Sequence, residues 1–291
     1  MNRHLALFLL TVVTTTMAGA MQYDGFQQAF APGVLLPWWQ LLLGGLYFSV
    51  PFLAFLTAHE FGHYGMARWH GLRPSLPYYL PAPLPLTGSL GAVIIFRGQF
   101  PDRRVLFDFA AGGPIAGFVV AVAACAIGLR WSVIVHGATS SGLPLGDPML
   151  FHWISDAVLG PMPTGADVSL HPTAFAGWLG LLFTMMNLIP ISQLDGGHIA
   201  YAALRRHSRW VTVVAFAAVT WAVIGWGAYT LTLWLVLLLV MMRVIGWEHP
   251  PALDDALPLD AGRLLLLALV IAILVLCYMP VPFPGMPAPW S

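Results

Sequence analysis

The sequence predicts an α-helical membrane protein, a polytopic bundle of about six or seven transmembrane helices with a small re-entrant β region. Of its 291 residues, 59% are hydrophobic and only 8% are charged, and the mean hydropathy is +0.80. A soluble protein of this size needs more charge to cover its surface. Several apolar runs are long enough to cross a bilayer as helices, and one proline-rich stretch is not helical.

The balance of charge excludes some partners. The formal net charge is zero, all twelve basic residues are arginines, and none belongs to a basic tail, so no nucleic-acid partner is expected and the lipid bilayer is the predicted environment. The two cysteines, Cys125 and Cys277, lie in apolar runs. They predict neither a disulfide framework nor a metal site, and we expect them to be core or lipid-facing residues.

Seven apolar segments are candidate spans. The first follows Arg3 and ends in an A-G-A that resembles a signal-peptidase site, so residues 1–21 are either a first transmembrane helix or a signal-like segment cleaved after Ala20. Pro190 and two glycines predict that the fourth segment is broken. The segments, with ends good to a few residues, are 5–21, 36–69, 105–129, 172–204, 210–226, 228–247 and 263–280.

The arginines predict the orientation of these spans. With the N-terminus in the cytoplasm, eleven arginines fall on the cytoplasmic side and only Arg130 falls outside. The loop 130–171 then lies on the outer face. Within it, "GDPMLFHWISDAVLG" predicts a short interfacial helix with Asp147 as N-cap and Pro148 in the first turn.

The segment between the second and third spans differs from the spans in composition. It opens with a proline-rich stretch and closes with a β-branched run, Ala92 to Phe96. It is too interrupted to cross the membrane and too apolar for a solvated loop. We expect a re-entrant segment with strand character, whose backbone is satisfied by protein or by a water-filled cavity. Asp102, Arg103 and Arg104 follow it and are predicted to form a membrane-surface cluster.

A polar cluster interrupts the second span. His59, Glu60 and His63 form the pattern H-E-x-x-H, and on a helix two histidines at i and i+4 share one face and can chelate one cation. Glu60 can reach a water on that cation without ligating it, which is the arrangement of a zinc hydrolase. An unpaired glutamate within a span costs on the order of 3 kcal/mol, so the pattern indicates function.

A catalytic zinc site usually takes a third protein ligand, and Asp195 is the best candidate. At 1.5 Å per residue, His59 lies roughly 13 Å above Arg68 and Asp195 roughly 15 Å above Arg205, so the two positions are level. One alternative for Asp195 is a helix N-cap after the break at Pro190. His198 is an alternative ligand or, one turn beyond Asp195, a group that hydrogen-bonds near the metal.

Two motifs together resemble the site-2 protease family of intramembrane zinc metallopeptidases (peptidase M50-like). They are H-E-F-G-H at 59–63 and N-L-I-P-I-S-Q-L-D-G-G at 187–197, and the pair is far more specific than either half. The segments "GSLGAVIIF", "FPDRR" and "FDFAAGGPIAGF" are also similar to this family, particularly to its forms without an inserted PDZ domain. The resemblance extends from the first helix to about residue 250.

The resemblance implies a set of roles. One Zn2+ per chain would be held by His59, His63 and Asp195, with Glu60 as the catalytic acid and base. Asn187 would contact the substrate backbone or the developing oxyanion, with an interhelical hydrogen bond as its alternative. The family also carries a membrane-entering β region where an edge strand could hold an unwound substrate.

The expected edge strand is the run from Gly91 to Phe96, with Gly91 and Val93 as the predicted substrate contacts. Gly113 and Gly117 are spaced G-x-x-x-G, which predicts close helix packing. Several scattered histidines are expected to be surface residues, namely His136, His152, His171, His207 and His249.

The predicted function is intramembrane proteolysis, the cleavage of transmembrane segments by zinc-activated water. One integral-membrane peptidase domain would occupy residues 1–291, with a catalytic core at 36–204 and additional C-terminal helices at 205–291. The expected partner is a single-pass membrane-protein substrate. The expected location is a prokaryotic cell membrane, with the active site in the cytoplasmic half of the bilayer.

Three other functions compete with this prediction. A zinc-dependent scaffold that binds helices would have no use for Glu60. A metal transporter would show several acids along its spans, whereas these spans are expected to hold essentially Glu60 and Asp195. A membrane zinc peptidase of the prenyl-protein-processing kind would supply a glutamate as third ligand, which the L-D-G-G context disfavours. The substrate, its cleavage site, any prior cut, the gating of entry and the oligomeric state stay open.

Overall fold

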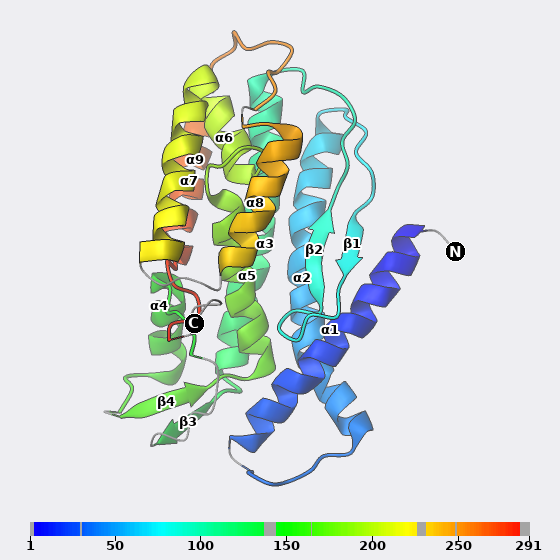
Figure 1. Ribbon diagram of the computed structural model, residues 1–291, viewed down its shortest axis with the longest axis vertical. Coiled ribbons are helices and arrows are strands. Elements are labelled where there is room, and N and C mark those ends of the chain that lie inside the picture. The colour runs from blue at the N-terminus through cyan, green and yellow to red at the C-terminus, as the bar shows by residue number, and fades with distance from the viewer. Residues whose placement is uncertain are drawn as a thin grey trace.

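The computed structural model describes residues 3–29, 31–136, 144–163, 165–225, 231–247 and 249–285. The chain is mostly helical, with long helices packed side by side and two small hairpins (Figure 1). Four stretches are long and apolar enough to cross a membrane, which agrees with the predicted helical membrane class. They are α1 (Arg3–Gln28), α2 (Trp38–Trp69), α3 (Arg103–Leu129) and the stretch Asp195–Gly225.

The broken fourth segment is confirmed. It consists of α5 (Pro172–Leu188) and α6 (Asp195–Leu204), separated by a turn that contains Pro190. A short 3-10 helix, η1 (Arg205–His207), joins α6 to α7 (Ser208–Gly225). The last two predicted spans are short apolar helices, α8 (Thr232–Ile245) and α9 (Ala261–Cys277). Residues 226 and 228–230, which were predicted to belong to spans, lie outside the described residues.

The first two helices pack closely. The hydroxyls of Thr15 and Ser49 are 2.7 Å apart, and a Cβ added at Gly19 would stand 2.2 Å from the carbonyl oxygen of Gly45. Small residues permit this approach, as in many membrane helix pairs. Because α1 runs unbroken through Ala20, cleavage there would divide a helix that packs against α2.

The predicted β region is a hairpin beside α2 (Figure 1). Strand β1 (Tyr78–Pro81) pairs antiparallel with β2 (Ser89–Val93), and the register shifts between Tyr79 and Pro81. The edge strand was predicted over Gly91–Phe96, but β2 begins earlier, at Ser89, and ends at Val93. Thr87 and Ser89 explain the early start, since their hydroxyls bond the hairpin backbone.

The loop after α3 folds into two elements. Strands β3 (Val133–His136) and β4 (Ala166–Ser169) pair in a two-stranded antiparallel sheet, and α4 (Met149–Leu159) lies between them in sequence. The predicted cap of α4 is wrong by one residue. Pro148 is the N-cap, and the Asp147 carboxylate instead accepts a hydrogen bond from His152 Nδ1 at 2.9 Å.

Candidate metal centre

One face of α2 presents the three polar residues of the H-E-x-x-H pattern to the interior. His59 and Glu60 are each 6% exposed and His63 is 4% exposed, so all three are buried. The helix continues on both sides with apolar residues, and Phe48 and Phe52 are fully buried two or three turns before the pattern. The cluster is therefore held within a packed apolar helix and is isolated from bulk water.

Asp195 meets both histidines, as the depth argument predicts. Its two carboxylate oxygens lie 3.3 Å from His59 Nε2 and 3.3 Å from His63 Nε2. The two Nε2 atoms are 3.1 Å apart. The capping alternative is wrong, because the N-cap of α6 is Leu194 and the Asp195 carboxylate is turned toward α2. Among the described residues, these three form a group whose ligand atoms all lie within 4.8 Å of one another.

The turn between α5 and α6 carries Asp195 to this position. Ser192 has a positive φ of 48°, and its hydroxyl donates to the carbonyl of Gly246 at 2.9 Å. The turn folds back so closely that a Cβ at Gly196 would stand 2.0 Å from the Leu188 carbonyl oxygen. At Gly197 a Cβ would stand 2.1 Å from the Ser192 carbonyl oxygen. The two glycines after Asp195 are thus required by backbone approach.

Helix α3 closes the other side of the centre through glycines. A Cβ at Gly113 would stand 2.1 Å from His63 Nε2, and one at Gly117 would stand 3.2 Å from the Cβ of His59. Close packing at the G-x-x-x-G pair is therefore confirmed. The bare backbone of α3 lies directly against the imidazole rings, which leaves them no alternative rotamer on that side.

The protonation pattern of the cluster suits a cation. His63 Nδ1 lies 2.8 Å from the carbonyl oxygen of Phe109, which can only accept, so Nδ1 carries the proton and Nε2 presents a lone pair. That lone pair, the Nε2 of His59 and the Asp195 carboxylate converge on one point. His59 Nδ1 is buried and finds no partner among the described residues. Two imidazoles and a carboxylate are the donors zinc prefers, with a fourth position left open.

Glu60 lies at the junction of the metal centre and the β hairpin. The backbone N–H of Ile94, just beyond β2, lies near its carboxylate. One turn earlier on α2, the hydroxyls of Thr57 and Tyr79 are 2.8 Å apart, which ties α2 to β1. The hairpin is therefore fixed against the same face of α2 that carries the polar cluster.

The edge of the hairpin nearest Glu60 is unpaired. Ile95 bonds toward the β1 side, since its carbonyl accepts from Ser75 N–H and its N–H donates to Ser75 Oγ, both at 2.9 Å. Successive residues of an extended chain point their main-chain groups to opposite sides. The main-chain groups of Ile94 therefore face away from β1, and β1 is the only strand that pairs with β2 in the described residues.

The same alternation bears on the two substrate contacts predicted in this strand. It turns the main chain of Val93 toward β1 and that of Ala92 toward the free edge. Gly91 lies at the register shift with a φ of 109°, and a Cβ there would meet no atom within 4 Å. Gly91 and Val93 stay predictions as substrate contacts, and Ala92 and Ile94 are better placed for main-chain pairing.

Asn187 and His198 flank the centre without joining it. Asn187 occupies the last turn of α5 and is half-buried, with no hydrogen bond to its side chain within the described part of the chain. His198 Nδ1 bonds to Nε2 of His249, so His198 is not a member of the ligand group. His249 stacks on Tyr201 at 4.5 Å, and it is therefore not the plain surface residue predicted.

A cavity of about 270 Å³ adjoins the free edge of the hairpin. Ile94 and Phe96 line it from the hairpin side, and Phe109, His198 and His249 line it from the helices and the 249–252 segment. Because Ile94 contacts Glu60, the cavity lies beside the metal centre. It offers both apolar walls and hydrogen-bonding groups to an extended chain.

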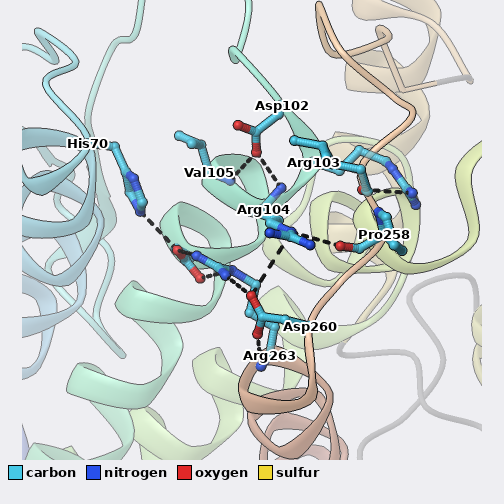
Figure 2. A network of polar contacts seen from close by, with 10 residues as sticks. His70, Asp102, Arg103, Arg104, Val105, Pro258, Asp260 and Arg263 are labelled. Atoms are coloured by element: carbon cyan, nitrogen blue, oxygen red, sulfur yellow. Dashed lines mark hydrogen bonds and ion pairs between the residues drawn. The ribbon is translucent and has the colours of Figure 1, made fainter.

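Figure 2 shows a second polar network, at the N-terminal end of α3. Asp102 caps α3 by accepting from the N–H groups of Arg104 and Val105. Arg103 was predicted to lie at the membrane surface, but it is 5% exposed and donates to the carbonyls of Ala202 and Leu257. The surface prediction is wrong for Arg103, because its guanidinium satisfies carbonyls at the end of α6 and in the segment before α9.

Sequence reasoning missed Asp108 in this network. It lies inside α3, 8% exposed, and pairs with His70 and Arg263, so the helix bundle holds a buried acid besides Glu60 and Asp195. Its place in the predicted span 105–129 was the available signal, because an acid within an apolar span needs a partner or a function. His171, also predicted to be a surface residue, is buried as the N-cap of α5.

The fold and the site define a helical membrane protein with a buried group of two histidines and an aspartate that could hold a metal ion. The model of Peptidase family M50 matches residues 47–225, which is most of the chain and contains the whole centre. The chain therefore belongs to peptidase family M50, in agreement with its resemblance to site-2 proteases.

Several plant proteins are similar to this chain. It is 30% identical over 246 residues to "Probable zinc metalloprotease EGY1, chloroplastic" of Arabidopsis thaliana, covering 79% of this chain and 42% of that protein. It is 30% identical over 254 residues to "Probable zinc metalloprotease EGY2, chloroplastic" of the same plant, covering 84% and 43%. The chain thus spans less than half the length of these relatives.

Proposed function

We propose that the protein is an intramembrane zinc metalloprotease that cleaves transmembrane segments of single-pass membrane proteins. The observation that carries this proposal is the convergence of His59, His63 and Asp195 beside the buried carboxylate of Glu60. A Zn2+ ion held by the first three would act as a Lewis acid and lower the pKa of a bound water to about 7. The names of the plant relatives support zinc as the metal.

Glu60 is the proton carrier of the proposed reaction. It accepts a proton from the attacking water and delivers it to the nitrogen of the leaving amine, so the same carboxylate serves as base and then as acid. The N–H of Ile94 lies near this carboxylate. Burial among apolar helices keeps other water away from the reacting bond.

The hairpin is the proposed holder of the substrate. A transmembrane helix hides its peptide bonds in its own hydrogen bonds, so it must unwind before cleavage. Main-chain pairing along the free edge at Ala92 and Ile94 would hold the unwound segment extended. Asn187, whose side chain has no hydrogen bond within the described residues, is proposed to contact the substrate backbone or the developing oxyanion. The cavity lined by Ile94 and Phe96 would receive a side chain from that segment.

The membrane arrangement belongs to the same proposal. The short helices α5, α8 and α9 would complete six or seven spans around one peptidase domain. The arginine distribution supports a site in the cytoplasmic half of a prokaryotic cell membrane, with the arginine-rich end facing the cytoplasm. The relatives named above are chloroplast proteins of plants, and their compartment is a property of those proteins.

Glu60→Gln tests the function. In detergent, the variant is expected to bind one zinc per chain, as the wild type does, and to lose cleavage of a transmembrane peptide. The amide keeps the shape of the side chain but cannot accept the proton. Zinc content by atomic absorption and cleavage by mass spectrometry give the two readouts. Cleavage at the wild-type rate by a zinc-loaded variant would contradict the proposed role.

A further inference from the structure

The polar network at the start of α3 contains a buried carboxylate, Asp108, and the one arginine that pairs with it among the described residues comes from α9. The side chain of Asp108 is 9% exposed. Arg263 of α9 donates hydrogen bonds to both of its carboxylate oxygens, from Nε to Oδ1 at 2.9 Å and from a second nitrogen to Oδ2. Asp260 caps α9 and also pairs with Arg263. Figure 2 shows Asp260 and Arg263 side by side in this network.

The same carboxylate also joins the two helices that form the metal centre. His70, the residue that ends α2, lies with Nε2 2.8 Å from Oδ2 of Asp108. His70 follows the ligand His63 by seven residues, or two helical turns. Asp108 therefore fixes α3 to α2 on the same side of the helix pair as the ligand.

The next residue along α3 contacts the ligand directly. The carbonyl of Phe109 accepts the hydrogen bond from His63 Nδ1 at 2.8 Å, which orients the imidazole and leaves Nε2 as the ligand atom. Gly113, one turn further, leaves no room for His63 to follow a shift of α3. A small movement at Asp108 must therefore reach the ligand.

We propose that Arg263 is a positioning residue for the metal centre: by holding Asp108, it fixes the Phe109 carbonyl that orients His63. Arg263 lies beyond residues 47–225, which the family model matches, so the last helix would complete a centre whose ligands all lie within that segment. The proposal rests on the proposed function, since it assumes that His63 binds a metal.

A charge-removal series tests this role in the full-length protein in detergent, with Co2+ as a visible probe of the centre. Arg263→Gln leaves the buried Asp108 carboxylate without its cation, and α3 must shift to hydrate it. The dissociation constant for Co2+ is expected to rise about tenfold, the usual range for losing support of a ligand. Adding Asp108→Asn removes the uncompensated charge, and affinity is expected to return to within about threefold of wild type.

Arg104→Gln is the matched control. Arg104 donates to the carbonyl of Pro258 in the segment that leads into α9, but no hydrogen bond or ion pair joins it to Asp108 among the described residues. Its Co2+ affinity and absorption spectrum are expected to match the wild type. A merely structural role for α9 would lower thermal stability in both single variants and leave the Co2+ spectrum and affinity unchanged.

Two results would overturn the inference. One is wild-type Co2+ affinity in folded Arg263→Gln, and the other is a double variant as weak as the single one. Should Arg263→Gln fail to fold, Arg263→Lys keeps a cation beside Asp108, so its Co2+ affinity is expected to stay within about threefold of wild type, and a tenfold loss there would equally contradict the inference. Absence of Co2+ binding in the wild type would instead defeat the proposed function itself.

Discussion

The same pair of helices, α2 and α3, carries two buried clusters of histidine and aspartate that differ in one respect. In the metal centre, Asp195 meets two histidine nitrogens, and no arginine pairs with it in the described residues. In the network at the start of α3, Asp108 meets a histidine and the guanidinium of Arg263. A buried carboxylate needs a cation. The second cluster contains its own, which makes it a structural clamp, and the first is arranged to take one from outside.

The test with the largest expected effect removes the carboxylate from the metal centre. Asp195→Asn keeps the volume of the side chain and removes a charged ligand, so zinc affinity is expected to fall by more than about a hundredfold, beyond what outer partners contribute. Competition with a chromophoric chelator measures it. Near-wild-type affinity would show that two histidines suffice and that the contrast with Asp108 is misplaced.

A second test crowds the metal centre without touching its charges. In Gly113→Ala, the new Cβ would stand 2.1 Å from His63 Nε2, so the ring must move and zinc affinity is expected to fall about 10-fold to 100-fold.

Gly65→Ala is the control for this crowding. Gly65 lies on α2 two residues beyond His63, and a Cβ there meets nothing within 4 Å. This variant should bind zinc as the wild type does, because it adds a methyl group to open space. Equal affinities in Gly65→Ala and Gly113→Ala would argue against a centre fixed by packing.

A third test uses a buried histidine that pairs with no charged group among the described residues. His171 is 6% exposed and surrounded by the rings of Phe26, Tyr47 and Trp131, and burial lowers its pKa to about 4. Between this value and about 6.5, the unfolded chain binds a proton that the folded chain does not. Acidification through this window should therefore destabilise the fold by up to about 1.4 kcal/mol per pH unit.

The measurement for His171 compares melting temperatures from pH 4 to pH 7 in chelator, so that no metal contributes. His171→Asn keeps a good N-cap for α5 and removes the titrating group. Its melting temperature is expected to fall less steeply with acidification than that of the wild type. Parallel curves for the two proteins would exclude His171 as the source.

The smallest effect on stability is expected for a solvent-exposed contact between one histidine and two aspartates. His152 lies between Asp147 and Asp156 on α4, and all three side chains are more than half exposed. Exposed pairs contribute about 0 to 1 kcal/mol, so Asp147→Asn should change the melting temperature by little more than the error of the measurement. A loss as large as that of a buried pair would mean that α4 is covered in the folded protein.

The local chemistry of the site could be predicted from the sequence. Helical spacing places His59 and His63 on one face whatever surrounds them, and the depth argument brings Asp195 level with them. Pro190 breaks its segment because proline lacks an N–H and cannot continue a helix. The G-x-x-x-G pair predicts close helix packing, because glycines have no side chain to keep two helix backbones apart.

The tertiary structure alone decided what surrounds that chemistry. Asp108 meets Arg263, 155 residues away, and no periodicity links such positions. Whether the main chain of Ile94 faces Glu60 or β1 depends on the register shift in the hairpin, and the strand propensities of the residues do not specify that shift. The N-cap of α4 is Pro148 and not Asp147, whose carboxylate bonds His152 instead. Spacing along a helix is set by the chain itself, whereas the partner of a buried charge is set by which distant segments fold against it.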